Sequence, residues 1–334
     1  MSYIFNCYFI KSTNGLYYYG IDTVDNLSLL PSTILIRPEL FESTSRLFPK
    51  TRIVPCNFAT FIYEVFIAWK SNLYIYTPSS HPLPFINKQI IVLHDTYPFV
   101  SHNGPIKRWL FLISAKTSKC LLAYINHADT LGFYLKNKFD LSRLIFIPNK
   151  FSGKITTYQL NRDPREKRLI IGLVGTDSPK KNYHALFADI RRLGYVNSAL
   201  FCIYGHSNGY TNELLRSFPE FDIGVIESND FSVPDFLASI DVVLSVAQNE
   251  GFGRPIASAL ESGVPCYLIE SPIFREFFDG GARFASDIPE MVSGVFEAWK
   301  LKKLQSPEFK PRDDLLSAFK LAIIKIENLL SNKN

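Results

Sequence analysis

The sequence lacks the features that hold small secreted proteins together or anchor a protein in a membrane. Its five cysteines are scattered, and none forms a Cys-x-x-Cys pair or stands at zinc-like spacing with a histidine. We therefore expect reduced thiols in a cytosolic compartment, and we exclude a disulfide framework or a structural zinc site. The apolar runs end after about ten residues, whereas a membrane-spanning helix needs about 20.

Other absences narrow the class of protein further. The first residues, MSYIFNCYFIKS, have no basic segment and no small-residue cleavage site, so we expect a cytoplasmic protein without a secretory signal. The sequence contains no short internal repeat and no low-complexity tract. With 47% hydrophobic and 20% charged residues among 334, the composition excludes a disordered chain and favours two globular domains.

Positive charge is concentrated in the first half of the chain. The net charge is +5, yet residues 1–154 have a clear excess of Lys and Arg, and the remainder has a slight excess of Asp and Glu. A basic half attracts anionic partners: a membrane surface, a phospholipid-linked substrate or nucleic acid. The alternative is the ordinary surface charge of a globular domain. Because the basic residues are dispersed and no nucleic-acid-binding motif is present, we expect no nucleic-acid partner.

The second half alternates short apolar runs with helical patterns. The expected strands are 168–175, 198–205, 224–228, 241–247 and 265–269, and the expected helices are 182–194, 230–240 and 255–262. Continuous apolar strands separated by helices indicate a parallel sheet covered on both faces.

The first half shows a similar but less regular pattern. The expected strands are 2–10, 32–38, 72–78, 89–95, 120–126 and 143–149, and the expected helices are 58–71 and 106–120. Residues 11–31 have no clear pattern, and 150–168 have the composition of a linker. Two charged helical patterns, 288–304 and 313–331, close the chain. We expect domains at 1–154 and 155–311, and a final helix within 312–334 that either stands alone or crosses back to the first domain.

Two segments that follow strands contain the residues best suited to bind a ligand. In open parallel sheets, ligands bind beyond the carboxyl ends of the strands. In NEGFGRPIASALESG, Glu250 can accept hydrogen bonds from hydroxyl groups, and the glycines before a helix can expose amides to an anion. In GTDSPKKN, Lys180 and Lys181 stand before a helix that Asn182 could cap, where two ammonium groups could neutralise a diphosphate without a metal.

These motifs resemble the retaining GT-B glycosyltransferases of family 4. NEGFGRPIASALESGVP resembles their E-G-F-G-x-P signature, and GTDSPKKN is similar to their phosphate loop. IIVLHDTYPF is similar to a strand of their N-terminal domain that ends in His-Asp. The resemblance spans residues 89–278 and implies an α/β fold of two Rossmann-like domains, whose parallel sheets face a central cleft.

The resemblance also implies the roles of individual residues. Glu250 would hold a hydroxyl of the donor sugar, Lys180 and Lys181 would bind the diphosphate, and His94 would face the sugar or the acceptor; the alternative for His94 is a structural histidine. The implied donor-binding residues are Gly175, Thr176, Lys180, Lys181, Glu250, Gly251, Phe252, Gly253 and Ser258.

Ser258 departs from the family pattern. The family usually has a second glutamate eight positions after the first, and it commonly binds the ribose of the nucleotide; this chain has Ser258 there. One hypothesis is a dTDP-sugar donor such as dTDP-rhamnose, whose deoxyribose lacks the 2′-hydroxyl. The alternative is that a backbone group or Glu261 takes over.

The resemblance implies a retaining, metal-independent transferase of a hexose or deoxyhexose. The donor would be a nucleotide diphosphate sugar, with no further cofactor, and the acceptor a glycan or lipid-linked glycan in bacterial surface polysaccharide synthesis. The first domain would bind the acceptor at the inner face of the plasma membrane. Residues 103–119 combine basic and apolar side chains that fit either a peripheral contact with an anionic membrane or a core helix. The alternative function is a catalytically inactive binding or scaffold protein of the same fold.

Overall fold

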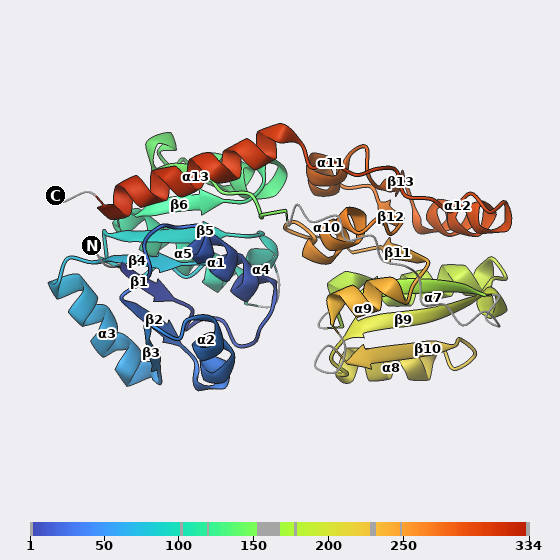
Figure 1. Cartoon of the computed structure of the whole chain (residues 1–334), viewed down its shortest axis with the longest axis horizontal. Helices are drawn as coiled ribbons and strands as arrows, with labels where there is room; N and C mark the ends of the chain where they lie inside the picture. The colour runs from blue at the N-terminus through green and yellow to red at the C-terminus, as the bar shows by residue number, and fades with distance from the viewer. Residues whose placement is uncertain are drawn as a thin grey trace. The chain divides into compact units, whose positions relative to one another are not determined.

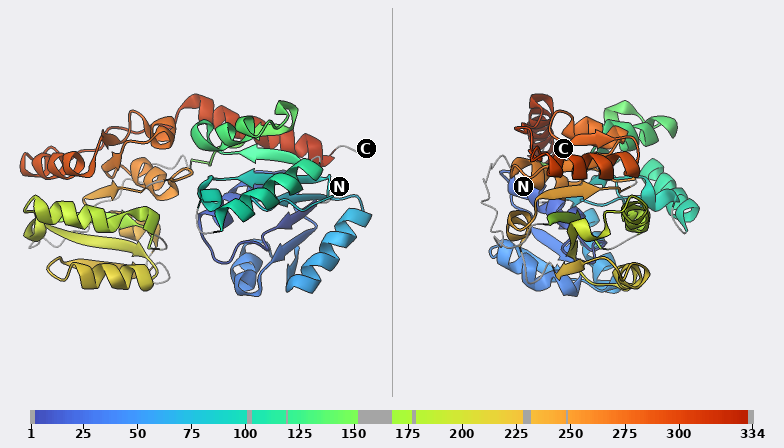
Figure 2. Two further views of the ribbon diagram at one scale, coloured as in Figure 1. Left: turned by 180° about the vertical axis from the view of Figure 1, so that it is seen from behind. Right: turned by 90° about the vertical axis from the view of Figure 1, so that its right-hand side faces the viewer.

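The computed structural model describes residues 3–100, 103–118, 120–151, 168–176, 179–227, 232–247 and 249–331. The chain forms two compact units (Figures 1 and 2). The N-terminal unit comprises Met1–Lys150 and Arg312–Asn334, and the C-terminal unit comprises Phe151–Pro311. The expected domain boundary at 154/155, and most of the expected linker, lie outside the described residues.

A parallel sheet of seven strands forms the centre of the N-terminal unit, in the order β3-β2-β1-β4-β5-β6-β7. The strands are β1 (Tyr3–Asn6), β2 (Thr33–Ile36), β3 (Arg52–Pro55), β4 (Tyr74–Thr77), β5 (Gln89–Leu93), β6 (Leu121–Tyr124) and β7 (Leu144–Phe146). The helices are α1 (Gly15–Asp25), α2 (Phe41–Leu47), α3 (Phe58–Lys70), α4 (Tyr97–Val100), α5 (Gly104–Thr117), α6 (Gly132–Lys136) and α13 (Asp313–Ser331).

The sequence predicted neither strand β3 nor the helices α1, α2, α4 and α6 of this unit. Helix α1 occupies the stretch without a clear pattern, and the Asn14 side chain caps it by accepting hydrogen bonds from the amides of Leu16 and Tyr17. Strand β3 lies at one edge of the sheet and is only partly buried. It therefore lacks the continuous apolar run that marks the central strands.

The pairing of β4 with β5 shows that α3 and α5 cover the same face of this sheet. Ile75 of β4 pairs with Gln89 of β5, so these two side chains point to the same face. Ile75 packs in the core cluster under α3. Ile91, two residues after Gln89 and hence on the same face, packs in the cluster under α5.

The C-terminal unit has a parallel sheet of six strands in the order β10-β9-β8-β11-β12-β13. The strands are β8 (Leu169–Val174), β9 (Ala199–Gly205), β10 (Ile223–Glu227), β11 (Val242–Ser245), β12 (Cys266–Ile269) and β13 (Arg283–Ala285). The helices are α7 (Tyr183–Arg192), α8 (Gly209–Ser217), α9 (Val233–Ala238), α10 (Arg254–Glu261), α11 (Pro272–Phe278) and α12 (Ile288–Lys300).

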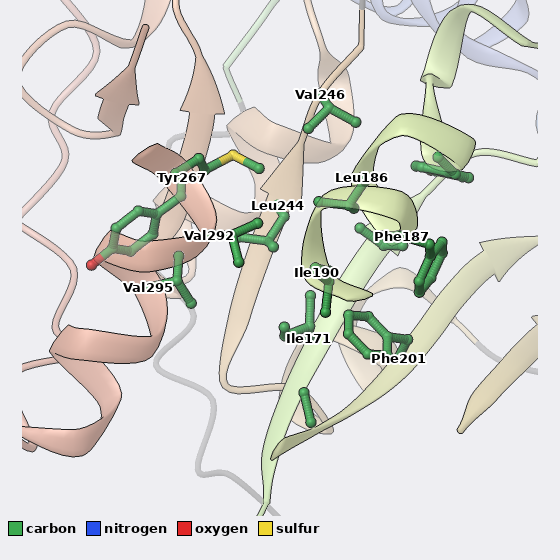
Figure 3. Close-up of a cluster of buried hydrophobic side chains, with 14 of the residues drawn as sticks. Ile171, Leu186, Phe187, Ile190, Phe201, Leu244, Val246, Tyr267, Val292 and Val295 are labelled. Atoms are coloured by element: carbon green, nitrogen blue, oxygen red, sulfur yellow. The ribbon is translucent and has the colours of Figure 1, made fainter. Parts of the chain in front are cut away.

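The core of the C-terminal unit joins its strands to the helices α7 and α12 (Figure 3). Phe187 of α7 packs edge-on against Phe201 of β9, with ring centroids 4.9 Å apart. Val292 and Val295 of α12 belong to the same cluster of buried side chains. The two units, each an α/β structure with parallel strands, confirm the Rossmann-like fold class predicted from the sequence. In the part of the chain that the structure describes, no helix has both the length and the apolar character to cross a bilayer.

Candidate active site

The lysine pair and Glu250 meet at the carboxyl edge of the C-terminal sheet. Strands β8 and β11 are parallel neighbours, so the segments that follow them emerge at the same edge. The segment after β8 leads to a short 3₁₀ turn, Pro179–Lys181, and the segment after β11 contains Glu250. Nζ of Lys181 lies 2.9 Å from Oε1 of Glu250, and Nζ of Lys180 lies 3.8 Å from Oε2.

The three charged side chains are largely withdrawn from solvent. Their exposed fractions are 18% for Lys180, 16% for Lys181 and 15% for Glu250. Burial raises the pKa of the Glu250 carboxyl, but the ammonium groups of Lys181 and then Lys180 outweigh it, so this pKa falls below its ordinary value. The site therefore holds a carboxylate between two cations at neutral pH.

Hydrogen bonds from two neighbouring helices hold the segment after β8 in place. The Tyr183 hydroxyl, at the start of α7, donates to the Gly175 carbonyl oxygen at 2.8 Å. The Asn208 side chain, which caps α8, donates to the carbonyl oxygen of Thr176. Thr176 itself is buried. These contacts fix the backbone of Gly175 and Thr176, directly after β8.

A close approach to Thr176 requires glycine at the end of β9. Gly205 has φ +153°, and a Cβ atom there would lie 2.6 Å from Oγ1 of Thr176. No real Cβ atom packs so closely, so any larger residue would displace Thr176 or the strand end. The sequence predicted no role for Tyr183, Asn208 or Gly205, although Gly205 stands at a strand end, where ligand-binding segments begin.

The glycine-rich segment after β11 begins helix α10 as the sequence predicted. Gly253 is the N-terminal flanking residue, with a left-handed φ of +95°, and a proline stands in the first turn. The side chain of Phe252 is buried, with its ring 4.7 Å from that of Phe277. The ring of Phe252 therefore serves the core of the unit and is not available to a ligand.

The predicted side-chain cap by Asn182 is wrong. Asn182 does flank the start of α7, but it has a left-handed φ of +56° and its side chain makes no capping hydrogen bond. Instead the Tyr210 hydroxyl accepts a hydrogen bond from the amide of Tyr183 at 3.0 Å. The Tyr210 hydroxyl of α8 thus accepts from a backbone amide at the start of α7 that a side-chain cap would otherwise have satisfied.

Ser258 is half-buried in the second turn of α10. Glu261, the alternative ribose-binding residue predicted from the sequence, is buried at the other end of the helix. At about 1.5 Å of rise per residue, Glu261 lies roughly 10 Å along the axis from the first residue of α10. Ser258 is therefore closer than Glu261 to the end of the helix at which Glu250 lies.

His94 follows β5 and belongs to the N-terminal unit, whereas the lysine pair and Glu250 belong to the C-terminal unit. Its Nε2 lies 2.9 Å from the Pro78 carbonyl oxygen, to which it donates. Its ring meets the Tyr19 ring edge-on, with centroids 4.5 Å apart. These contacts fix the ring at the carboxyl edge of the N-terminal sheet, and the predicted role towards a donor sugar stays a prediction.

The chain has two α/β units with parallel sheets, and the C-terminal unit gathers paired ammonium groups and a carboxylate at the carboxyl edge of its sheet. These features define a protein of the GT-B glycosyltransferase fold. The resemblance inferred from the sequence is confirmed by the relatives that the chain matches. No protein-family model matches the sequence.

The chain is similar to a curated glycosyltransferase over most of its length. It is 21% identical over 282 residues to the O-antigen chain mannosyltransferase RfbU of Salmonella typhimurium, which covers 78% of this chain and 74% of RfbU. This relative supports the assignment of the chain to the glycosyltransferase class of enzymes.

Solved structures share the fold across both units. HepE of Anabaena, solved in complex with UDP and glucose, superposes with a TM-score of 0.73 at 14% identity and covers 99% of this chain and 98% of its own. WaaG, a glycosyltransferase involved in lipopolysaccharide biosynthesis, superposes with a TM-score of 0.67 at 11% identity and covers 99% and 100%. At such low sequence identities, the structural similarity establishes a shared fold and nothing further.

Proposed function

We propose that this protein transfers a hexose or deoxyhexose from a nucleotide diphosphate sugar to a glycan or lipid-linked glycan, with retention of the anomeric configuration. The observation that carries the proposal is the cluster of Lys180, Lys181 and Glu250 at one edge of the C-terminal sheet. The names of the relatives support the class of reaction, since RfbU is an O-antigen mannosyltransferase and HepE has been solved with UDP-glucose.

In this proposal the lysine pair holds the diphosphate, and Glu250 accepts a hydrogen bond from a hydroxyl of the donor sugar. The bond between the anomeric carbon and the diphosphate oxygen breaks as the acceptor hydroxyl attacks from the same face of the ring. The leaving diphosphate takes the proton of that hydroxyl, and the two ammonium groups stabilise its negative charge. No nucleophile from the protein is required.

Donor hydrolysis tests the proposal without knowledge of the acceptor. Nucleotide diphosphate sugars are incubated with the protein, and the release of nucleoside diphosphate is measured for the wild type and for Glu250→Ala. We expect slow release by the wild type and at least about 10²-fold less by the variant. Tight donor binding without release or transfer would identify the alternative, a binding protein that has lost catalysis.

The proposed reaction is independent of metal, because the ammonium groups supply the charge that a divalent cation would otherwise provide. The same assay with a chelator tests this part. Release that is unchanged supports it, and release that is abolished by the chelator and restored by Mg²⁺ or Mn²⁺ overturns it.

The donor we propose is a dTDP-sugar. Ser258 occupies the helix position at which the family has a ribose-binding glutamate, and a deoxyribose has no 2′-hydroxyl to satisfy. The melting temperature of the protein is measured with dTDP, UDP, GDP, CDP and ADP. We expect dTDP to raise it most, because ligand binding stabilises the folded state by mass action. A larger rise with UDP or GDP contradicts this choice of nucleotide and leaves the proposed transfer reaction intact.

A further inference from the structure

Helix α3 of the N-terminal unit exposes an aromatic face. Phe58, Ile62, Phe66 and Trp69 follow one another at intervals of three or four residues, so they lie along one side of the helix. All four side chains are exposed, and Trp69 has 58% of its surface accessible to solvent. The opposite side, with Phe61 among others, packs in the core. A helix that is apolar on both sides is expected only where a second partner covers it.

The connection between β4 and β5 exposes another aromatic ring. Gln89 is buried, and its side chain clamps this connection by accepting from the Leu83 amide at 2.9 Å and donating to the Ile86 carbonyl oxygen at 2.6 Å. Phe85 projects from the clamped turn with 75% of its surface exposed and a left-handed φ of +64°. Such a φ is disfavoured for a bulky residue, so the turn is held in place by its surroundings.

Helix α5 exposes a second apolar stripe. Ile106, Trp109, Leu110 and Ile113 stand at helical spacing and are all exposed, Trp109 by 60%. Phe111 faces the other way and is buried in the core. The sequence predicts a membrane contact or a core helix here, and α5 has both an exposed and a buried apolar side.

The two stripes and the turn at Phe85 belong to one surface of the N-terminal unit. Helices α3 and α5 cover the same face of the sheet, as the pairing of β4 with β5 requires. Leu83 and Ile86, on either side of Phe85, pack in the cluster under α3. Helices α3 (blue) and α5 (teal) can be followed in Figures 1 and 2. We call the outer side of α3, the turn at Phe85 and the outer side of α5 the α3–α5 surface.

The charges of these three segments are almost all positive. Their basic residues are Lys70, Lys88, Lys107, Arg108 and Lys116. The acidic residue of α3, Glu64, is buried on its inner side and forms an ion pair with Arg52. Neither α5 nor the connection at 78–88 contains an acid. The α3–α5 surface therefore presents apolar rings among cations, with its carboxylate turned inward.

We propose that the α3–α5 surface docks the N-terminal unit on an anionic lipid bilayer. Exposed rings and aliphatic side chains insert among the acyl chains near the headgroups, while the lysines meet the lipid phosphates. Tryptophan is enriched at this boundary because its ring is apolar and its N–H can donate a hydrogen bond. A second copy of the chain is a poorer partner, because a two-fold interface would place the cations of one copy against those of the other.

Vesicle co-sedimentation of the full chain tests this proposal, and it requires neither donor nor acceptor. The vesicles are pure phosphatidylcholine or a mixture with phosphatidylglycerol. The test variant is Phe66→Glu with Trp69→Glu. The matched control is Leu321→Glu with Ile324→Glu, on α13, where exposure is 66% and 52% and the residues lie outside the surface.

We expect the wild type and the α13 control to bind the anionic vesicles, with weaker binding at high salt. The test variant should bind at least about tenfold more weakly, since it places two negative charges on the surface. Three results overturn the proposal: no binding to anionic vesicles, equal loss in both variants, or a wild-type dimer that the test variant alone dissociates. The last result would assign the surface to self-association.

Discussion

At the residue scale, the decisive feature is that Lys181 and Glu250 are paired in a place where neither is well hydrated. Charges withdrawn from water are stable only when an opposite charge or hydrogen bonds replace the lost hydration. Here the Glu250 carboxylate forms ion pairs with the ammonium groups of Lys180 and Lys181, so removal of Glu250 leaves two like charges close together. Removal of one lysine leaves the carboxylate with a partner. The three residues are therefore expected to respond unequally to substitution.

The two lysines should differ in their effect on turnover. Lys181→Ala is expected to lower kcat by about 10²-fold or more, because it removes a cation that stabilises the leaving diphosphate. Lys180→Ala should have a smaller effect, since its Nζ lies 3.8 Å from Glu250 against 2.9 Å for Lys181. Steady-state kinetics with thermal melting as a folding control measures both. If both variants turned over at the rate of the wild type, the assigned roles would be contradicted.

The pH dependence of stability should reveal the Glu250 pair. The pKa of Glu250 is lower in the folded than in the unfolded chain, so the pair contributes stability above the ordinary value of 4.5 and loses it as the pH falls through the folded value. Glu250→Gln should therefore be less stable than the wild type near neutral pH by about 1–3 kcal/mol. This difference should shrink as the pH falls below 4.5 and through the lowered pKa of the folded chain, because the wild-type carboxyl then becomes protonated.

Urea unfolding across a pH series measures this difference. Glu308→Gln is the control, because Glu308 forms its ion pair with Lys310 in solvent, and such pairs contribute little to stability. A difference between wild type and Glu250→Gln that stays constant with pH would show that the carboxylate is not stabilised by the lysines.

At the scale of elements, the segment after β8 is shaped by its neighbours more than by its own sequence. Helix α7 supplies the Tyr183 hydroxyl, α8 supplies the Asn208 side chain, and the end of β9 supplies the space beside Thr176. Each of these contacts joins residues from different elements. The segment can therefore be perturbed by changes that touch neither the lysines nor Glu250.

Replacement of Gly205 should damage the site from a distance. Gly205→Ala would place a Cβ atom 2.6 Å from Oγ1 of Thr176, so we expect a loss of about 1–3 kcal/mol of stability and weaker binding of nucleoside diphosphate. Gly224→Ala, on the adjacent strand β10, is the control, because a Cβ there would meet nothing within 4 Å. Calorimetric titration and urea unfolding compare the two. If the variants behave alike, the close approach at Thr176 has no influence on the site.

The strands and helices of the C-terminal unit were largely predictable from the sequence. Buried parallel strands are continuous apolar runs, and β8, β9 and β11 fall within the expected ranges. Helix α1 was not predictable, because its run of tyrosines hides the apolar period. The convergence of Lys181 with Glu250 followed from the rule that ligands bind at strand ends, whereas the support from Tyr183 depends on packing between elements that a pattern does not encode.

At the scale of the whole molecule, the N-terminal unit is built from two separate parts of the chain. Helix α13 packs beside β7, and Glu327 on it accepts a hydrogen bond from the backbone amide of Ser28 (Figure 1). The C-terminal unit, Phe151–Pro311, is inserted between these parts as one continuous stretch. The stability of the first unit therefore depends on residues that follow the second.

Truncation after Pro311 should unfold or loosen the N-terminal unit and spare the C-terminal unit. Helix α13 buries several large apolar side chains, including Leu315, Phe319 and Ile326. At about 1.5–3 kcal/mol for each such side chain, their loss is comparable with the total stability of a domain. Hydrogen exchange with mass spectrometry should show lost protection in β6 and β7 and normal protection in β8 and β9. Uniform loss in both units would contradict the division into two units.

Because α13 belongs to the N-terminal unit, this unit cannot finish folding until the end of the chain has been synthesised on the ribosome. Domains usually fold as they emerge, but the N-terminal unit has to wait for a helix that is made after the entire C-terminal unit. At roughly 5–20 residues per second, that wait is on the order of ten seconds. During it, the apolar surface that α13 later covers is open to chaperones and to aggregation. The nascent chain is therefore expected to need protection at its beginning, although its later portion can already be folded.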